Sequence, residues 1–522
     1  MQRIFSQSAQ PSHSSAPGTT RPRGTGPVRF TILALGLGLF AGLPLGCGGT
    51  PLPAPSSAGV KPHAGKNLKI AVADHALGAE VRGRARAWAN RNSATVTVIA
   101  DKPTGEVADA DIAIVPQYGI AGPASRGELA PVPDSLTGNG KSFRWDTLFV
   151  PFQTSLVQWG SQIVAVPIAG DGLVCVYRAD RFRDPAAAKA FRDRFQKDLA
   201  PPRTWEDIAE IAESFSRPGQ PSLPPLSADG AAALALFHQL AACYDRAPGG
   251  SGNKESGSAA RALSFHIDID GGKFQPRLKA PAFAAAYTWF HSTAGYRPAT
   301  AGDPLVAIST GTAVVGVLTL REVARLPRDP KTGAVSDAFG IVPVPGTRTY
   351  FDAEGRVQQA TGGRNAIPYL GDNGAYAFVF KRSTNAAAAW DFLSDLAGPD
   401  GSAGTLSESN IGAGPIRESH ISTQTGFAIW QRYGFDDART KDLGTAMFAY
   451  ANSTVANPAL PLRTPDAPQV YAILESQLRR AASGQATGPE SASAAAAAWA
   501  EHDRKQEAGQ LKLWRRNAAG LD

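Results

Sequence analysis

Two kinds of apolar pattern alternate along the chain. Short runs of mostly apolar, often β-branched residues predict buried strands at 68–73 (LKIAVA), 95–100 (TVTVIA), 111–115 (DIAIV), 163–166, 173–177, 313–318, 340–344 and 375–380. Between the first two runs, residues 80–90 have the composition of a helix. This order of strand, helix and strand favours an α/β fold.

Two later segments repeat their apolar residues at helical spacing. Thr204 can cap a helix, because the residues after it place one apolar stripe on one side. We interpret this stripe and a second one near the carboxyl end as core faces; their residues are Trp205, Ile208, Ile211, Ala212 and Phe215, then Val470, Ile473, Leu474 and Leu478. An alanine-rich helix is predicted at 491–499.

The amino-terminal segment has the pattern of an export signal. Three arginines between positions 21 and 29 precede an apolar run at 30–45, which is shorter than the roughly 20 residues that span a bilayer as a helix. The run ends at Gly46 and Cys47, which resembles a bacterial lipoprotein signal. We therefore expect 1–46 to be a signal peptide and Cys47 to be lipidated. Because Pro44 stands where that signal usually has Leu, ordinary signal cleavage or an uncleaved anchor is the alternative.

Composition narrows the class of protein. Residues 47–66 are rich in Pro, Gly and Ser and predict a flexible tether. The 522 residues are 43% hydrophobic and 19% charged, which is typical of a soluble globular chain of two large lobes or three domains. Without the four arginines of the signal, 48 basic residues face 45 acidic ones. This balance speaks against a nucleic-acid partner.

Cysteine use is sparse. After Cys47, only Cys175 and Cys243 remain, and their separation in sequence does not decide whether they pair. Cys175 lies in a predicted strand, where a small buried apolar side chain is the expected role. No metal site is predicted.

Catalytic motifs give no support for an enzyme. Residues 135–142 end like a phosphate-binding loop, but Ser135 occupies the position of its first glycine. The eight histidines form no His-Glu-x-x-His motif, and no Gly-x-Ser-x-Gly motif offers a serine nucleophile. We predict a protein without catalytic residues or cofactor, although an enzyme with an unmarked site stays open.

Eight segments, read in order, resemble the bacterial extracellular solute-binding proteins of ABC importers, of the maltodextrin and sugar-receptor type. The resemblance covers about 66–510. The matching segments are 111–118 (DIAIVPQY), 127–133, 160–171 continuing to 176–180, 202–207 (PRTWED), 311–313 with 339–346 (FGIVPVPG), 375–396, 414–417 and 474–487.

This resemblance implies the two-lobed fold of the type II periplasmic binding proteins, in which crossing hinge strands join two α/β lobes around an interlobe cleft. The first lobe would comprise 66–169 and 376–416, and the second 170–375 and 417–522. It also implies a monomer that closes over a small solute on the outer side of the membrane and delivers it to the transmembrane subunits of an ABC permease.

Candidate ligand residues lie at predicted strand ends, where loops converge in open α/β sheets. Asp171 is the first choice, since related sugar receptors often have an acidic residue there; the alternative is that it caps a turn. The other candidates at strand ends are Asp74, His75, Gln117 and Tyr118. Tyr471 is taken from the closing helix, although core packing is equally open for it. Arg364, Asn365 and Tyr376 flank another crossing; the alternative there is that Gly362 and Gly363 form only a flexible loop.

A carbohydrate is the expected ligand, because sugars need flat apolar faces and planar polar groups. A polyamine-type ligand is the alternative, since Asp74 and Asp171 supply carboxylates. Presentation of a ligand to a membrane sensor is the alternative to import. Insertions at 218–230 and 247–258 are outside the family core and can reshape the cleft.

Overall fold

Two β-sheets, each covered by helices, organise the chain. The structure is a computed structural model that describes residues 61–521 except 101–108, 139–140, 247–264, 270–271, 273, 409, 423–425 and 452–457. The predicted signal peptide, Cys47, most of the predicted tether and the insertion at 247–258 lie outside the described residues. The described residues belong to one unit of the chain, Val60–Asp522.

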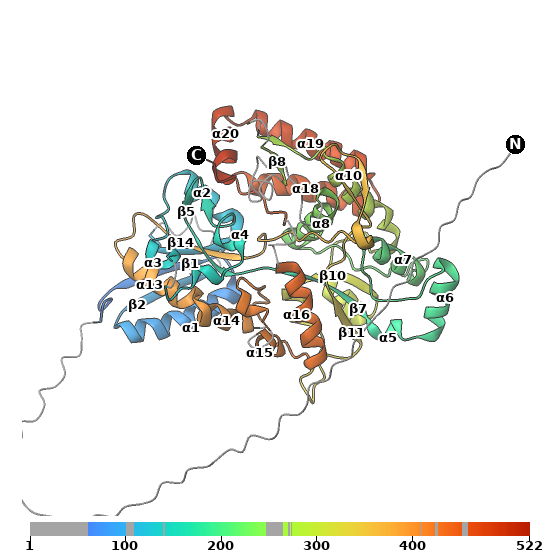
Figure 1. Ribbon diagram of the computed structural model, residues 1–522, viewed down its shortest axis with the longest axis horizontal. Helices are drawn as coiled ribbons and strands as arrows, with labels where there is room; N and C mark the ends of the chain where they lie inside the picture. The colour runs from blue at the N-terminus through green and yellow to red at the C-terminus, as the bar shows by residue number, and fades with distance from the viewer. Residues whose placement is uncertain are drawn as a thin grey trace, which may run out of the picture. The chain divides into compact units, whose positions relative to one another are not determined.

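The first sheet has five strands in the order β2-β1-β3-β14-β6. Figure 1 labels β1, β2 and β14 of this sheet on its left side. Strand β1 is parallel to β2 and β3, and β14 is antiparallel to β3 and β6. The carboxyl ends of β1 and β3 therefore meet at one edge. The strands are β1 Asn67–Val72, β2 Thr95–Ala100, β3 Ile112–Pro116, β6 Val166–Ala169 and β14 Ala375–Val379.

The second sheet has three antiparallel strands in the order β10-β7-β11. They are β7 Leu173–Arg178, β10 Val315–Thr319 and β11 Phe339–Val342. Three short antiparallel pairs complete the strands: β4 Gln158–Trp159 with β5 Gln162–Ile163, β8 Ile267–Asp268 with β9 Gln275–Pro276, and β12 Thr349–Phe351 with β13 Val357–Gln359.

Helices cover both sheets. Those of the first half are α1 His75–Asn92, α2 Ala121–Ser125, α3 Asp134–Thr137, α4 Val150–Gln153, α5 Ala179–Phe182, α6 Pro185–Phe195, α7 Trp205–Phe215 and α8 Gly230–Asp245. Those of the second half are α10 Pro281–Ser292, α11 Pro304–Thr310, α12 Leu320–Val323, α13 Ala386–Ala397, α14 Pro399–Ser407, α15 Gly426–Gln431, α16 Asp437–Ala451, α18 Ala467–Ala482, α19 Gly488–Arg504 and α20 Ala508–Ala518.

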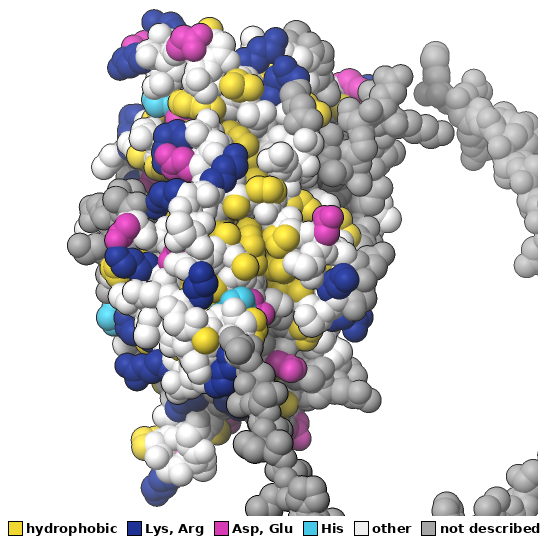
Figure 2. All heavy atoms as spheres, turned by 90° about the vertical axis from the view of Figure 1, so that its left-hand side faces the viewer, with side chains coloured by type: hydrophobic (Ala, Val, Ile, Leu, Met, Phe, Trp, Pro, Cys, Tyr) yellow, Lys and Arg dark blue, Asp and Glu magenta, His cyan; other side chains and the backbone are white. Residues whose placement is uncertain are grey.

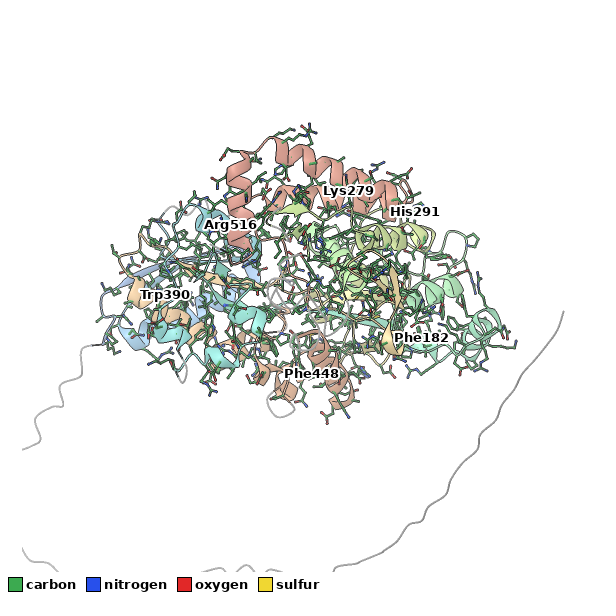
Figure 3. All side chains as sticks on the ribbon, turned by 45° about the horizontal axis from the view of Figure 1, so that its top comes forward. Phe182, Lys279, His291, Trp390, Phe448 and Arg516 are labelled. Carbon is green, nitrogen blue, oxygen red and sulfur yellow. The ribbon has the colours of Figure 1, made fainter. Side chains whose placement is uncertain are left out.

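The helices divide between the sheets. We call the first sheet with α1, α13 and α14 the first lobe. The second lobe is the second sheet with α5 to α8, α10 to α12, α16, α18 and α19. Figure 3 shows Trp390 of α13 and Phe182 of α5 on opposite sides of the ribbon, one in each lobe.

Most predicted strands and helices are present within one to five residues of their predicted ends. The prediction of one strand at 163–166 is wrong. Ile163 pairs with Gln158 in the β4–β5 hairpin, whereas Val166 pairs with Ala377 in the first sheet. The chain changes partners within this run, which apolar pattern alone does not reveal.

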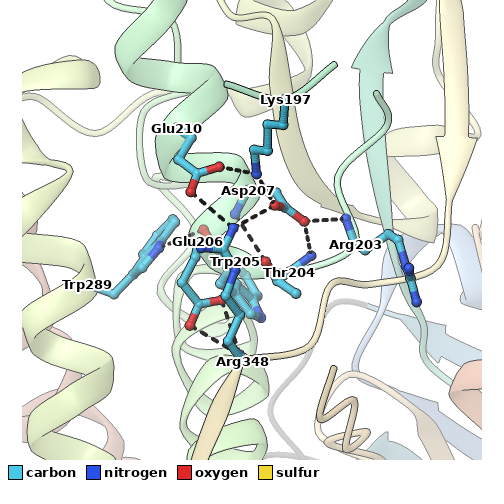
Figure 4. Close-up of polar contacts among 9 residues, drawn as sticks. All are labelled: Lys197, Arg203, Thr204, Trp205, Glu206, Asp207, Glu210, Trp289 and Arg348. Atoms are coloured by element: carbon cyan, nitrogen blue, oxygen red, sulfur yellow. Dashed lines mark hydrogen bonds and ion pairs between the residues drawn. The ribbon is translucent and has the colours of Figure 1, made fainter. Parts of the chain in front are cut away.

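The predicted cap at Thr204 is confirmed. Its side chain accepts a hydrogen bond from the Asp207 N–H, and the Asp207 carboxylate accepts one from the Thr204 N–H at 2.9 Å. Asp207 also binds Lys197 and Arg348, as Figure 4 shows. These cations and N–H groups outweigh the burial of Asp207 and lower its pKa. The cluster ties the start of α7 to the loop that carries Arg348.

The mixed surface charges and the buried cysteines of this chain are typical of a globular protein. Figure 2 shows Lys and Arg side chains scattered over one face with acidic side chains between them. No helix in the described ranges is long and apolar enough to cross a membrane. Cys175 in β7 and Cys243 in α8 are both buried free thiols, so the pairing that the sequence left open does not occur in this structure.

Candidate ligand-binding cleft

Two chain crossings and one loop meet where the lobes join. Residues 170–172 lead from β6 of the first lobe to β7 of the second, and residues 371–374 lead into β14. The loop 411–414, which follows α14, lies against them. Gly170 and Gly414 exchange both main-chain hydrogen bonds, at 3.1 and 2.9 Å. Glycine is required at 414, because a Cβ atom there would collide with the main chain of Asp171.

Asp171 joins the two crossings. Its carboxylate accepts hydrogen bonds from the N–H of Gly371 at 3.0 Å and from the N–H of Asn373 at 3.3 Å. The residue is only 8% exposed. Burial raises the pKa of this carboxyl, and the N–H groups act in the opposite direction. A single side chain therefore holds one crossing against the other.

A cavity of about 310 Å³ opens beside this junction. Residues of both lobes form its wall. From the first lobe come the ends of β1 and β3, and from the second come the start of α8 and the turn from β10 into α12. The polar side chains in the wall are Asp74, Tyr118, Asp171, Asp229, Thr319, Arg321, Asp372 and Asn373.

One ion pair spans the cavity from lobe to lobe. Asp74 caps α1, since its Oδ1 accepts a hydrogen bond from the Leu77 N–H at 2.8 Å. Its Oδ2 lies 2.8 Å from Nη2 of Arg321, which belongs to α12. Burial opposes ionisation of Asp74, but Leu77 and Arg321 together lower its pKa. Asp74 is therefore an ionised carboxylate with its charge balanced across the cleft.

The pKa of Asp372, in the same wall, is raised instead of lowered. Burial first, and then the neighbouring charge of Asp171, raise the pKa of Asp372 to about 8. Tyr471 bonds to this carboxyl from behind the wall. His238 lies 4.0 Å away, and burial lowers its pKa to about 3. At neutral pH, Asp372 is therefore chiefly a neutral carboxylic acid that can donate a hydrogen bond as well as accept one.

Three of the residues predicted as ligand contacts come together in this wall: Asp74, Tyr118 and Asp171. His75 and Gln117 are their chain neighbours. His75 begins α1, and the buried Gln117 donates a hydrogen bond to the Leu156 carbonyl at 3.5 Å.

The other four predicted residues are not in the cavity wall. Tyr376 packs against Phe152 in the first lobe. The buried Asn365 donates to the Arg246 carbonyl at 2.6 Å, and Arg364 donates to the Val344 carbonyl at 2.8 Å. Tyr471 lies behind Asp372, with its hydroxyl accepting a hydrogen bond from the Leu462 N–H. Each of the four therefore contacts other parts of the protein and does not line the cavity.

Five polar residues of the cavity wall were not among the sequence-based candidates: Asp229, Thr319, Arg321, Asp372 and Asn373. A strand-end signal existed for all of them except Asp229. Asp372 and Asn373 stand between glycines just before a predicted strand, and Arg321 follows the predicted strand at 313–318. The same strand-end argument that selected Asp74 applies to them. Asp229 had no comparable signal, because it lies at the end of the insertion at 218–230, where it caps α8.

A cleft between two α/β lobes, walled by residues of both and crossed by glycine-rich connections, defines a ligand-binding protein with two hinged lobes. The sequence profile of the bacterial extracellular solute-binding protein family matches residues 89–430. The chain belongs to this family and is a solute-binding protein, which also implies a location outside the cytoplasm.

Solved structures share the fold. The solute-binding protein of an ABC transporter from Agrobacterium radiobacter K84, in complex with ribitol, is 17% identical; the match covers 84% of this chain and 99% of that one, with a TM-score of 0.59. The cyclic alpha-maltosyl-1,6-maltose binding protein from Arthrobacter globiformis is also 17% identical, over 86% and 100% of the two chains, with a TM-score of 0.58.

A third solved structure shares the fold. An ABC substrate-binding protein from Listeria monocytogenes in complex with cycloalternan is 15% identical over 84% of this chain and 99% of that one, with a TM-score of 0.57. No curated protein sequence matches the chain. At these identities the likeness concerns the fold, and it confirms the two-lobed architecture expected from the sequence.

The role of Asp171 is testable without a ligand. In Asp171→Asn, the new amide N–H₂ faces main-chain donors, so one hydrogen bond is lost and a donor is buried without an acceptor. We expect the free energy of unfolding to fall by about 1–3 kcal/mol. Amide hydrogen exchange at Gly371 and Asn373 should accelerate. Urea unfolding and exchange measured by mass spectrometry check both effects.

Asp229→Asn is the matched control for this variant. It makes the same substitution in the same cavity wall, but Asn caps a helix as well as Asp, and the hydrogen bond from the Ala231 N–H is kept. Its stability should stay within about 0.5 kcal/mol of the wild type. Unchanged exchange at 371–373 in Asp171→Asn would contradict the joining role.

Proposed function

We propose that this protein is the extracytoplasmic substrate-binding component of an ABC importer. It captures a small neutral carbohydrate or polyol by closing its lobes, without altering it, and delivers it to the membrane permease. The observation that carries the proposal is the polar cleft between the lobes. The fold is shared with proteins crystallised with ribitol and with cycloalternan, which supports this ligand class.

The cavity supports a compact ligand. A volume of about 310 Å³ lies at the lower end of the range for small-molecule sites, which favours a polyol or a sugar of one or two rings over a long oligosaccharide. The wall offers carboxyl and amide groups for hydroxyls. It also has apolar patches for the C–H face of a pyranose, formed by Leu77, Ile114, Val115, Leu320 and Ile411.

The charge state of the wall favours a neutral ligand over a polyamine. Four carboxyl groups line the cavity, but they do not act as four free negative charges. Asp74 is balanced by Arg321, Asp372 is chiefly protonated at neutral pH, and Asp171 is occupied by main-chain N–H groups. Asp229, the fourth carboxyl group of the wall, caps α8 and has no cationic partner in the described structure. A polyamine would need several unpaired carboxylates, which this wall lacks among the described residues.

We assign the ligand contacts to Asp74, Tyr118, Asp171, Arg321, Asp372 and Asn373. Of the sequence-based candidates, His75 and Gln117 take a supporting role beside the wall. The lobe boundaries at 169/170, 375/376 and 416/417 remain part of the proposal. The first two are supported by the membership of β6 and β14 in one sheet and of β7 in the other, with β14 beginning one residue earlier, at Ala375.

A thermal-shift screen identifies the ligand. It should include ribitol, mannitol and maltose as neutral ligands and spermidine as the polyamine. A ligand at about 100 times its Kd adds about 2.7 kcal/mol to stability, which is readily seen as a raised Tm.

Asp74 offers the sharpest test of the binding site. In Asp74→Asn the cap of α1 is kept, but the charge that faces Arg321 is lost. Affinity measured by calorimetry should fall about tenfold.

Asp184→Asn is the control, since Asp184 also caps a helix but lies on the surface of α6 away from the cleft. Its affinity for the ligand should equal that of the wild type.

Three outcomes would overturn parts of the proposed function. A Tm raised by spermidine alone would overturn the neutral-ligand proposal. Release of product from a bound glycoside would overturn the non-catalytic role. Binding without any permease-dependent uptake in cells would favour presentation to a membrane sensor instead.

The anchor is part of the same proposal. Cys47 carries lipid after removal of residues 1–46 and holds the protein at the outer face of the membrane through the tether at 47–66. The support is the sequence pattern alone. In cells, the wild-type protein should fractionate with membranes and Cys47→Ala should be released. Mass spectrometry of the mature amino terminus checks the lipid directly, and an unmodified terminus at another residue would contradict it.

A further inference from the structure

A second, much smaller cavity lies beside the cleft in the second lobe. Its volume is about 30 Å³, and its wall includes Trp205, Trp289 and Arg297. Ala232 and Thr319 line both this cavity and the cleft. The small cavity and the ligand cleft therefore share part of their walls, but none of the proposed ligand contacts lies in the wall of the small cavity.

Arg297 is a buried cation without a counter-ion. The residue is 7% exposed, and it forms no ion pair in the part of the chain that the structure describes. Its guanidinium donates one hydrogen bond there, from Nη2 to Oγ1 of Thr293 at 3.1 Å, and its Nε–H has no acceptor. Burial alone lowers the pKa of Arg297 to about 10. An unbalanced buried charge is costly for a fold.

Other buried arginines of this chain are satisfied differently. Arg417 donates to the carbonyls of Arg144 and Ala397, each at 2.7 Å. Arg463 donates through both of its Nη groups to the carbonyls of Gln158 and Ala518, although its Nε–H also has no acceptor in the described structure. Arg297 instead has one threonine hydroxyl and the rings of two aromatic neighbours, whose centroids lie 5.2 and 5.5 Å from its Cζ. Cation–π contacts of this kind offset only part of the lost hydration.

A second donor in the same wall is also unsatisfied. Trp205 is 1% exposed, and its indole N–H has no acceptor in the described structure. The indole of Trp289 is different, since its N–H donates to the Trp205 carbonyl at 3.0 Å (Figure 4). Buried donors without partners are rare in folded proteins and mark a site where an acceptor is expected.

Glu322 does not supply that acceptor. Its carboxyl lines the cavity, but its Oε2 already accepts hydrogen bonds from the N–H and the hydroxyl of Thr319 at 2.7 and 2.9 Å. Burial raises the pKa of Glu322, which moves it toward the neutral form. No ion pair joins it to Arg297 within the described ranges.

We infer that this cavity binds one small monovalent anion, of the size of chloride, between the guanidinium of Arg297 and the indole N–H of Trp205. The anion would supply both the missing charge and the missing acceptor. The volume of about 30 Å³ suits one or two atoms of the size of a water oxygen, which excludes a phosphate or sulfate. This site is separate from the proposed solute function and does not depend on it.

The test compares thermal unfolding of the full protein in 100 mM sodium chloride, sodium bromide and sodium gluconate at one pH. Gluconate keeps the ionic strength but is too large for the cavity. Chloride and bromide should raise the Tm by about 2 °C relative to gluconate. Arg297→Met should lose this difference. Arg463→Met, which removes another buried arginine whose Nη groups are bonded to carbonyls, should keep it.

A crystal grown in bromide provides a second readout that needs no variant. An anomalous peak is expected beside Arg297 Nε and Trp205 Nε1, within about 3.5 Å of both. Equal Tm values in all three salts, an unchanged bromide effect in Arg297→Met, or a water without anomalous signal in the cavity would each overturn the proposal. Should Arg297→Met not fold, the bromide crystal decides.

Discussion

A carboxylate that accepts main-chain N–H groups holds the centre of this protein together. Asp171 lies on the crossing from β6 to β7 and bonds the crossing that enters β14. Buried main-chain N–H groups must have acceptors, and here one side chain supplies two of them. Asp171 therefore connects the two crossings between the lobes. The loop at 411–414 packs against its main chain through Gly414, where a side chain would have no room.

The polar character of the cleft follows from this junction. Carboxyl ends of parallel strands and starts of helices converge there, so acidic side chains gather in a small space. The structure reduces their repulsion in three ways: Arg321 pairs with Asp74, Asp372 is held as the neutral acid, and Asp171 faces N–H groups. The result is a wall rich in hydrogen-bonding groups but low in free charge, which suits hydroxyls better than ammonium groups.

Much of this arrangement could be predicted from the sequence, and the limits have physical causes. Apolar runs identified most strands, and strand ends led to Asp74, Tyr118 and Asp171. Spacing does not determine which way a side chain points, so Tyr376 and Asn365, chosen by position, proved to be buried and outside the cavity wall. Arg321 and Asp372 also stand beside predicted strands, but their roles depend on contacts between segments far apart in the chain, which a strand end alone does not reveal.

The central claim is that the two lobes close over a small solute by rotation about the crossings at 170–172 and 371–374. Single-molecule energy transfer tests it, with dyes on cysteines introduced at the exposed residues Arg86 of α1 and Lys189 of α6. The native Cys175 and Cys243 are fully buried and should not react. A solute that binds by calorimetry should move the molecules to one state of higher transfer. An unchanged distribution at saturating solute would contradict the account.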